Sequence, residues 1–136
     1  MAQLINLRSE AGPPKASGWR FVPMLTVMAT IFMLSDQPGD TLTLPDYVGS
    51  DKVAHALAYG TLAAACLYAA HPYNWAENRF ITGTGVALIC LLYGLSDEFH
   101  QSFIPGRESS LGDVAADLFG ATLTVLLWLW QYKKFR

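Results

Sequence analysis

Residues Leu111–Trp130 have the sequence LGDVAADLFGATLTVLLWLW, and they set the architecture that we expect for the whole chain. Their second half, Leu123–Trp130, is apolar on every side of a helix. A helix of a soluble four-helix bundle would instead keep a polar face along its whole length. The stretch also has about the 20 residues that an α-helix needs to cross the hydrocarbon core of a bilayer. It therefore predicts a transmembrane helix.

Three further apolar stretches accompany it, at Phe21–Leu34, Val53–Ala70 and Phe80–Leu95. The first and third are short, but their flanking residues add length. Only helices and closed barrels satisfy backbone groups in lipid, and these stretches lack the alternation of barrel strands. We therefore predict an all-α fold, a four-helix transmembrane bundle. The first stretch is expected to be retained, because no signal-peptide cleavage site of small residues follows it.

The composition of the 136 residues supports a membrane protein, since 52% are apolar and 15% are charged. Soluble domains carry about 25% charged residues. The net charge of −2 provides no basic surface, so we expect no nucleic-acid partner. The lipid bilayer is the partner expected for all four helices. Cys66 and Cys90 lie in apolar stretches and form no disulfide framework.

Lysine and arginine are unevenly distributed between the two ends of the predicted bundle. One end receives Arg8, Lys15, Arg20, Arg79, Lys133, Lys134 and Arg136, and the other receives Lys52 and Arg107. By the positive-inside rule, both termini are cytoplasmic and the protein is a multi-pass protein of the cytoplasmic membrane. We divide the chain into a mobile leader (1–18), a membrane domain (19–132) and a basic cytoplasmic tail (133–136).

Polar side chains gather at the opposite, extracytoplasmic end. They begin the second helix, end the third and begin the fourth, and ionisable residues inside a membrane are candidates for function. The candidate ligand-binding residues are Lys52, Tyr59, Asp97, His100, Gln101, Arg107, Asp113 and Asp117. The candidate catalytic residues are Glu98 and His55.

Two of these helices carry polar residues at every fourth position. The stripes are Asp51, His55 and Tyr59 on the second helix, and Tyr93, Asp97 and Gln101 on the third. Both stripes must turn away from lipid, and the short connection makes the two helices antiparallel. We therefore expect His55 to face Asp97 or Glu98.

Charge pairing gives two more expectations. An ionised Asp117 is costly inside a membrane, so it should face the bundle interior. It should lie near Lys52, Arg107 or His55, or else be protonated. Buried ionisable groups must be paired, so we also expect Arg107 to form an ion pair with one carboxylate of the set Asp97, Glu98, Asp113 and Asp117.

Four motifs make the chain resemble the VanZ-like family of small membrane proteins. They are Ser-x-Gln-Pro at 35–38, Asp-Lys-x-x-His-x-x-x-Tyr at 51–59, Tyr-Gly-x-x-Asp-Glu-x-x-Gln-x-Phe-x-Pro-Gly-Arg at 93–107 and Asp-x-x-x-Asn-x-x-Gly at 113–120. Asp117 stands where the family pattern has Asn. The family is named for a protein that confers resistance to the glycopeptide teicoplanin. The resemblance implies a membrane protein of this kind, and it implies no particular reaction.

The favoured hypothesis is that the chain binds or handles an amphiphilic cell-envelope molecule, such as a lipid-linked precursor or a glycopeptide, or contributes to glycopeptide (teicoplanin) resistance. Lys52 and Arg107 would hold an anionic head group. One alternative is an intramembrane enzyme acting on a lipid-linked substrate by acid–base or metal chemistry, with Glu98 as the acid–base residue and His55 as its partner. Another is an accessory subunit bound to a larger membrane-protein complex.

No local motif settles whether the chain is an enzyme. His-Glu-x-x-His, Gly-x-Ser-x-Gly and a phosphate-binding loop are all missing from the sequence. We therefore assign no metal ligand and no cofactor from the sequence.

Overall fold

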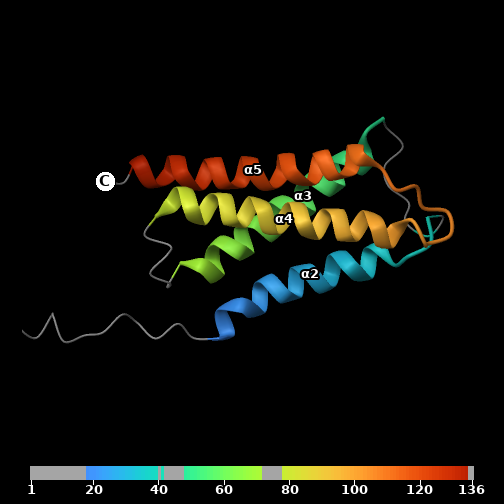
Figure 1. The fold of residues 1–136 in the computed structure, drawn as a ribbon, viewed down its shortest axis with the longest axis horizontal. Helices are drawn as coiled ribbons and strands as arrows, with labels where there is room; N and C mark the ends of the chain where they lie inside the picture. Colours follow the sequence, from blue (N-terminus) through green and yellow to red (C-terminus); the bar gives the residue numbers. More distant parts are fainter. Residues whose placement is uncertain (1–17, 40, 42–47, 72–77, 135–136) are drawn as a thin grey trace, which may run out of the picture.

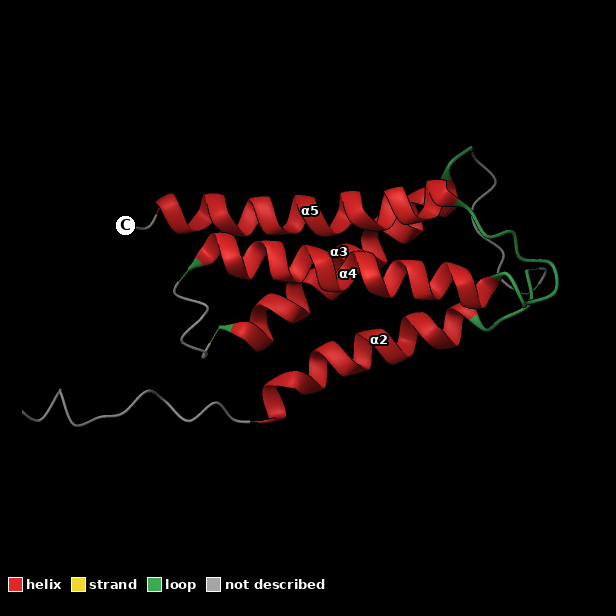
Figure 2. Ribbon diagram, in the orientation of Figure 1, coloured by secondary structure: helices red, strands yellow, loops and turns green. Residues whose placement is uncertain are grey.

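The structure is a computed structural model that describes residues 18–39, 41, 48–71 and 78–134. Its elements are a short 3₁₀ helix η1 (Gly18–Phe21) and the α-helices α2 (Val22–Ser35), α3 (Ser50–Ala70), α4 (Arg79–Gln101) and α5 (Leu111–Lys134). The described residues form helices and loops only (Figure 2). The all-α prediction is confirmed. Residues 1–17 of the predicted leader and 135–136 of the predicted tail lie outside the described residues.

The four long helices run up and down in a bundle (Figure 1). Helix α3 packs against α5, α4 also packs against α5, and α2 packs against α3 at the side of the bundle. Helix α2 begins and α5 ends at the same end of the bundle. We call the other end, where α2 and α4 finish and α3 and α5 begin, the polar end.

Each α-helix is long and apolar enough to cross a membrane, counting η1 and α2 together as Gly18–Ser35. Large apolar side chains such as Met33, Phe80 and Phe119 are more than 60% exposed on the outside of the bundle. An exposed apolar surface of this kind belongs in lipid. The four predicted helices are confirmed as long and apolar enough to span a membrane, and the chain is a multi-pass membrane protein.

Small residues let the helices approach closely at the centre of the bundle. A Cβ atom at Gly120 on α5 would collide with the backbone carbonyl of Ala56 on α3. Side-chain packing around this crossing is tight, because Tyr59, Leu62 and Ala121 are at most 1% exposed. Close contact through glycine is a common way for membrane helices to associate. It brings the polar residues at the start of α3 against those at the start of α5.

Helix α4 continues farther than its apolar stretch, to Gln101. Polar residues of its last two turns face the bundle, and the Gln101 side chain donates to the Asp97 carboxylate one turn earlier. The following turn then folds back over α2, where the Gly39 amide donates to the Pro105 carbonyl. These contacts bring the ends of α2 and α4 together beside the starts of α3 and α5.

Candidate functional site

Charged residues from three helices meet inside the polar end. The Lys52 ammonium on α3 lies 2.6 Å from Oδ1 of Asp113 on α5 and 2.8 Å from Oδ2 of Asp51. One turn deeper, Nδ1 of His55 lies 2.8 Å from Oδ1 of Asp117. Asp117 is fully buried, and it faces the interior beside His55 as expected.

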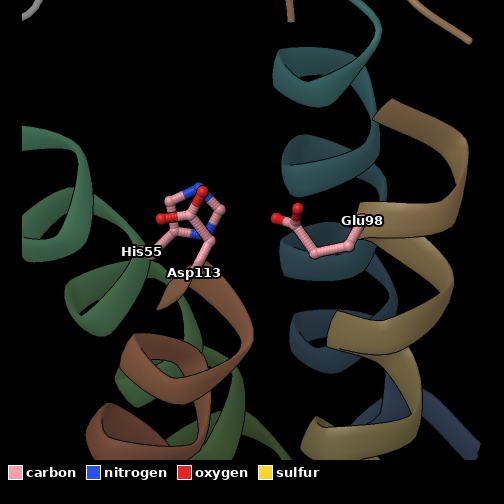
Figure 3. Close-up of side chains that lie close together, drawn as sticks. All are labelled: His55, Glu98 and Asp113. Atoms are coloured by element: carbon pink, nitrogen blue, oxygen red, sulfur yellow. The ribbon is translucent and has the colours of Figure 1, made fainter. Parts of the chain in front are cut away.

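Glu98 of α4 completes this group. It is 4% exposed, and its Oε2 accepts a hydrogen bond from the Ser110 amide just before α5. Its Oε1 has no partner among the described residues. Donor atoms of His55, Glu98 and Asp113 lie within 4.8 Å of one another. Figure 3 shows the Glu98 carboxylate pointing toward the other two side chains. The carboxylate cluster, as we name it, comprises Lys52, His55, Glu98, Asp113 and Asp117.

The prediction that His55 faces Asp97 or Glu98 is thus confirmed for Glu98, whose donor atom lies within 4.8 Å of that of His55. The hydrogen-bond partner of the imidazole is nevertheless Asp117, which comes from α5. A carboxylate bonded to Nδ1 fixes the orientation of the ring and leaves Nε2 for another group. The arrangement can therefore hold a proton or a cation between the imidazole and the carboxylates.

A second group, the polar chain, links α2, α3 and α4 next to the carboxylate cluster. Asp97 Oδ2 accepts hydrogen bonds from the Tyr59 hydroxyl at 3.5 Å and from Gln101 Nε2 at 3.2 Å. Gln101 Nε2 also donates to the Ser35 hydroxyl at 3.1 Å. All four side chains are buried. The two polar stripes predicted on α3 and α4 therefore meet at Tyr59 and Asp97.

A pocket of about 180 Å³ opens between α2, α3 and α4 at the polar end. One part of its lining is apolar: Ile31, Leu34, Ala54 and Ala58. The other part is polar: Ser35, Asp51, His55, Tyr59, Asp97, Gln101 and Arg107. The pocket thus has an apolar wall beside a polar one. His55 belongs both to the polar wall and to the carboxylate cluster.

The ion pair predicted for Arg107 is wrong. Among the described residues, its guanidinium forms no ion pair with any of the four carboxylates considered. It donates instead to the carbonyl oxygens of Leu34 at 2.8 Å and Gln37 at 3.1 Å. The last carbonyl groups of a helix have no hydrogen-bond partner within the helix. The turn after α4 lies over the end of α2, so the Arg107 guanidinium is close enough to bind these carbonyl groups.

His100 also lies apart from the two polar groups. Its Nε2 is 3.1 Å from Oδ1 of Asp36, and its ring packs against Phe32 with centroids 4.9 Å apart. Both partners belong to the end of α2. Of the ten candidate residues, the structure brings Lys52, His55, Tyr59, Asp97, Glu98, Gln101, Asp113 and Asp117 together, places Arg107 on the pocket wall and leaves His100 outside.

Comparison with known proteins gives one positive finding. The sequence model of the VanZ/LLP1 family matches residues 15–132. The chain belongs to the VanZ/LLP1 family. No curated protein and no solved structure matches it. The VanZ/LLP1 match spans all four long helices, so the carboxylate cluster, the polar chain and the pocket all lie within the family domain.

Three residues of this VanZ/LLP1 site were not predicted from the sequence to belong to it. Ser35 ends the polar chain, and its place in the first family motif was the available signal. The Ser110 amide binds Glu98, and nothing in the sequence indicates this contact. Gly94 matters through its missing side chain, because a Cβ atom there would lie 2.8 Å from Oδ2 of Asp117.

Proposed function

We propose that this VanZ/LLP1 protein binds an amphiphile with an anionic head group in the pocket between α2, α3 and α4. The observation that carries the proposal is the pocket lining, which is apolar on the side of Ile31 and Ala58 and polar toward Arg107. Ligand sites generally combine an apolar wall with a few well-placed polar groups. In a membrane protein, such a lining suits a lipid tail and its head group.

Arg107 is the residue that we assign to the head group. A guanidinium has five N–H donors, and the bonds to Leu34 and Gln37 use its Nε and one terminal nitrogen. The remaining donors are available to a phosphate or carboxylate, which arginine binds well. Lys52 does not line the pocket and is engaged by two aspartates, so we now assign it to the carboxylate cluster.

The family gives the proposal its ligand class. The VanZ-like family is named for a protein that confers resistance to teicoplanin, a glycopeptide that carries an acyl chain. We therefore propose a lipid-linked cell-envelope precursor or an acylated glycopeptide as the physiological ligand. Binding at the polar end would also explain why the polar residues of this chain are concentrated there.

We also propose that the polar end faces away from the cytoplasm and that both termini are cytoplasmic. Arg20 and Arg79 belong to the starts of η1 and α4, at the end opposite the pocket, and the remaining basic residues of both tails adjoin the same end in sequence. The positive-inside rule places this end in the cytoplasm. A ligand would then enter from the outer leaflet.

Native mass spectrometry of the full-length protein, purified from membranes in mild detergent, tests the binding proposal. We expect the wild type to retain an amphiphile. Ala54→Leu adds bulk to the pocket wall and should abolish its retention. Ala115→Leu makes the same change on an exposed position of α5 and should leave retention unchanged. Wild-type protein that carries no amphiphile, or equal retention by both variants, would refute the proposal.

A further inference from the structure

We propose that the carboxylate cluster is a binding site for a divalent transition-metal cation, held by His55, Glu98 and Asp113. The three residues come from α3, α4 and α5, and their donor atoms lie within 4.8 Å of one another. Two carboxylates and one imidazole are suitable ligands for cations such as Zn²⁺ or Mn²⁺. The proposal concerns the cation alone and does not depend on amphiphile binding in the pocket.

The carboxylate of Glu98 provides an independent indication of a missing ligand. Its Oε1 is buried and has no hydrogen-bond partner among the described residues. The residue is 4% exposed, and its carboxylate points toward His55 and Asp113 (Figure 3). A buried carboxylate oxygen without a partner is costly, and a cation between these three side chains would remove that cost.

The charges of the cluster point the same way. Glu98, Asp113 and Asp117 are carboxylates, and the Lys52 ammonium pairs with Asp113 alone of the three. Arg107, the cation expected to balance the remainder, is bonded to α2 instead. Lys52 is also shared with Asp51, so the carboxylates outnumber the ammonium, and a divalent cation would offset the excess negative charge. Asp113 can bind Lys52 with Oδ1 and a metal with Oδ2, because a carboxylate accepts at both oxygens.

Asp117 has the position of a supporting residue for such a metal. Histidines that bind metals through one ring nitrogen usually donate the other N–H to a carboxylate. Here Nδ1 of His55 lies 2.8 Å from Oδ1 of Asp117, so Nε2 is the nitrogen available to the cation. Donor atoms on one Zn²⁺ are about 3.4 Å apart, given bonds of about 2.1 Å. The three donors, which lie within 4.8 Å of one another, would have to approach by up to about 1.4 Å to reach that spacing.

Zinc binding by the full-length protein in lipid nanodiscs tests the proposal, with Zn²⁺ titrated calorimetrically after the protein has been treated with a chelator. We expect one Zn²⁺ per chain. Glu98→Gln removes a ligand charge and should weaken binding at least about 10-fold, and Asp117→Asn should weaken it about 10- to 100-fold. His100→Ala removes a second histidine–aspartate pair of the polar end and should not change the affinity.

X-ray absorption at the zinc edge adds a readout of the ligands themselves. We expect nitrogen and oxygen ligands with one imidazole, and no sulfur from Cys66 or Cys90. Sulfur ligation, the absence of a stoichiometric site, or equal affinities of wild type and Asp117→Asn would overturn the proposal. A loss on His100→Ala as large as that on Glu98→Gln would show adventitious surface binding and would also overturn it. If Glu98→Gln fails to fold, Asp117→Asn decides the matter.

Discussion

At the scale of single residues, Asp117 is the most deeply buried charged residue of the polar end. It is fully buried, its Oδ1 is bonded to His55, and its Oδ2 has no partner among the described residues. The Oδ2 atom lies against Gly94, where any side chain would crowd it. The aspartate is therefore held between α3 and α4 by a hydrogen bond on one side and by close packing on the other.

Two substitutions at this position separate its shape from its charge. Asp117→Asn keeps the side-chain shape and an oxygen for the His55 N–H, so we expect a change in the free energy of unfolding of less than about 1 kcal/mol. Asp117→Ala leaves His55 without its partner and opens a cavity, so we expect a loss of about 3 kcal/mol. Unfolding in mixed detergent micelles, followed by circular dichroism, measures both. Equal losses for the two variants would contradict the packing described here.

For individual residues, the sequence predicted which side chains are buried and which lie near one another better than it predicted their hydrogen-bond partners. The cost of a charge in lipid was sufficient to place Asp117 in the interior beside a basic group. The partner of Arg107 could not be predicted, because it depends on how the turn after α4 lies over the end of α2. Backbone acceptors such as the Leu34 carbonyl are identical in every residue type, so the sequence carries no signal for them.

At the scale of elements, the close crossing of α3 and α5 positions the site. Gly120 on α5 lies directly against the Ala56 backbone, and Thr124 one turn later donates to the Gly60 carbonyl. Lys52 and His55 are within one turn of this crossing on α3, and Asp113 and Asp117 precede it on α5. Their pairing follows from the approach of the two backbones.

Gly120→Ala tests this crossing. The added methyl group would meet the Ala56 carbonyl, so α3 and α5 must separate, and we expect a loss of at least about 1–3 kcal/mol of unfolding free energy. Gly85→Ala is the matched control on α4, since a Cβ atom there meets nothing within 4 Å. It should leave stability equal or slightly higher, because alanine favours helix over glycine. The same unfolding assay measures both, and a Gly120→Ala protein as stable as wild type would be evidence against the crossing.

The four helices themselves were predictable, because each apolar stretch is long enough to require a helix in lipid. Their ends were less so. Helix α4 continues to Gln101 because its polar last turns are buried by α2 and α3, which hydropathy does not reveal. The carboxylate cluster was predicted as a set of residues from their common end of the bundle. The sequence did not predict that the carboxylate cluster and the polar chain are separate groups. That separation depends on how the helices pack against one another, and residue spacing along a single helix carries no information about it.

For the whole molecule, the polar end and the opposite end differ in chemistry. The polar end holds the pocket and the carboxylate cluster. At the other end, the Arg20 guanidinium donates to the Tyr68 carbonyl at 3.0 Å and lies 4.2 Å from the centre of the Tyr68 ring. Aromatic and basic side chains of this kind are typical of a membrane interface. The basic residues at this end agree with the proposed orientation, because lysine and arginine are in excess on the cytoplasmic side of membrane proteins.

Cysteine labelling of intact cells by a membrane-impermeant maleimide tests the orientation. Ala2→Cys and Arg136→Cys should remain unlabelled, because we place both termini in the cytoplasm. Glu108→Cys, at an exposed position of the polar end, should be labelled. The wild type is the blank, since Cys66 and Cys90 are buried. Labelling of the termini but not of position 108 would invert the topology.

Photo-crosslinking with a lipid tests the central claim, the amphiphile pocket, most directly. Full-length protein in phosphatidylcholine vesicles would receive a phosphatidic acid with a diazirine in its acyl chain, and the labelled residues would be mapped by mass spectrometry. We predict labelling at the pocket wall, at Leu34 and Ala58, that excess unlabelled phosphatidic acid displaces and Ala54→Leu abolishes. Labelling of exposed positions such as Phe119 should persist in both cases. Pocket labelling that neither the competitor nor Ala54→Leu reduces would contradict the account.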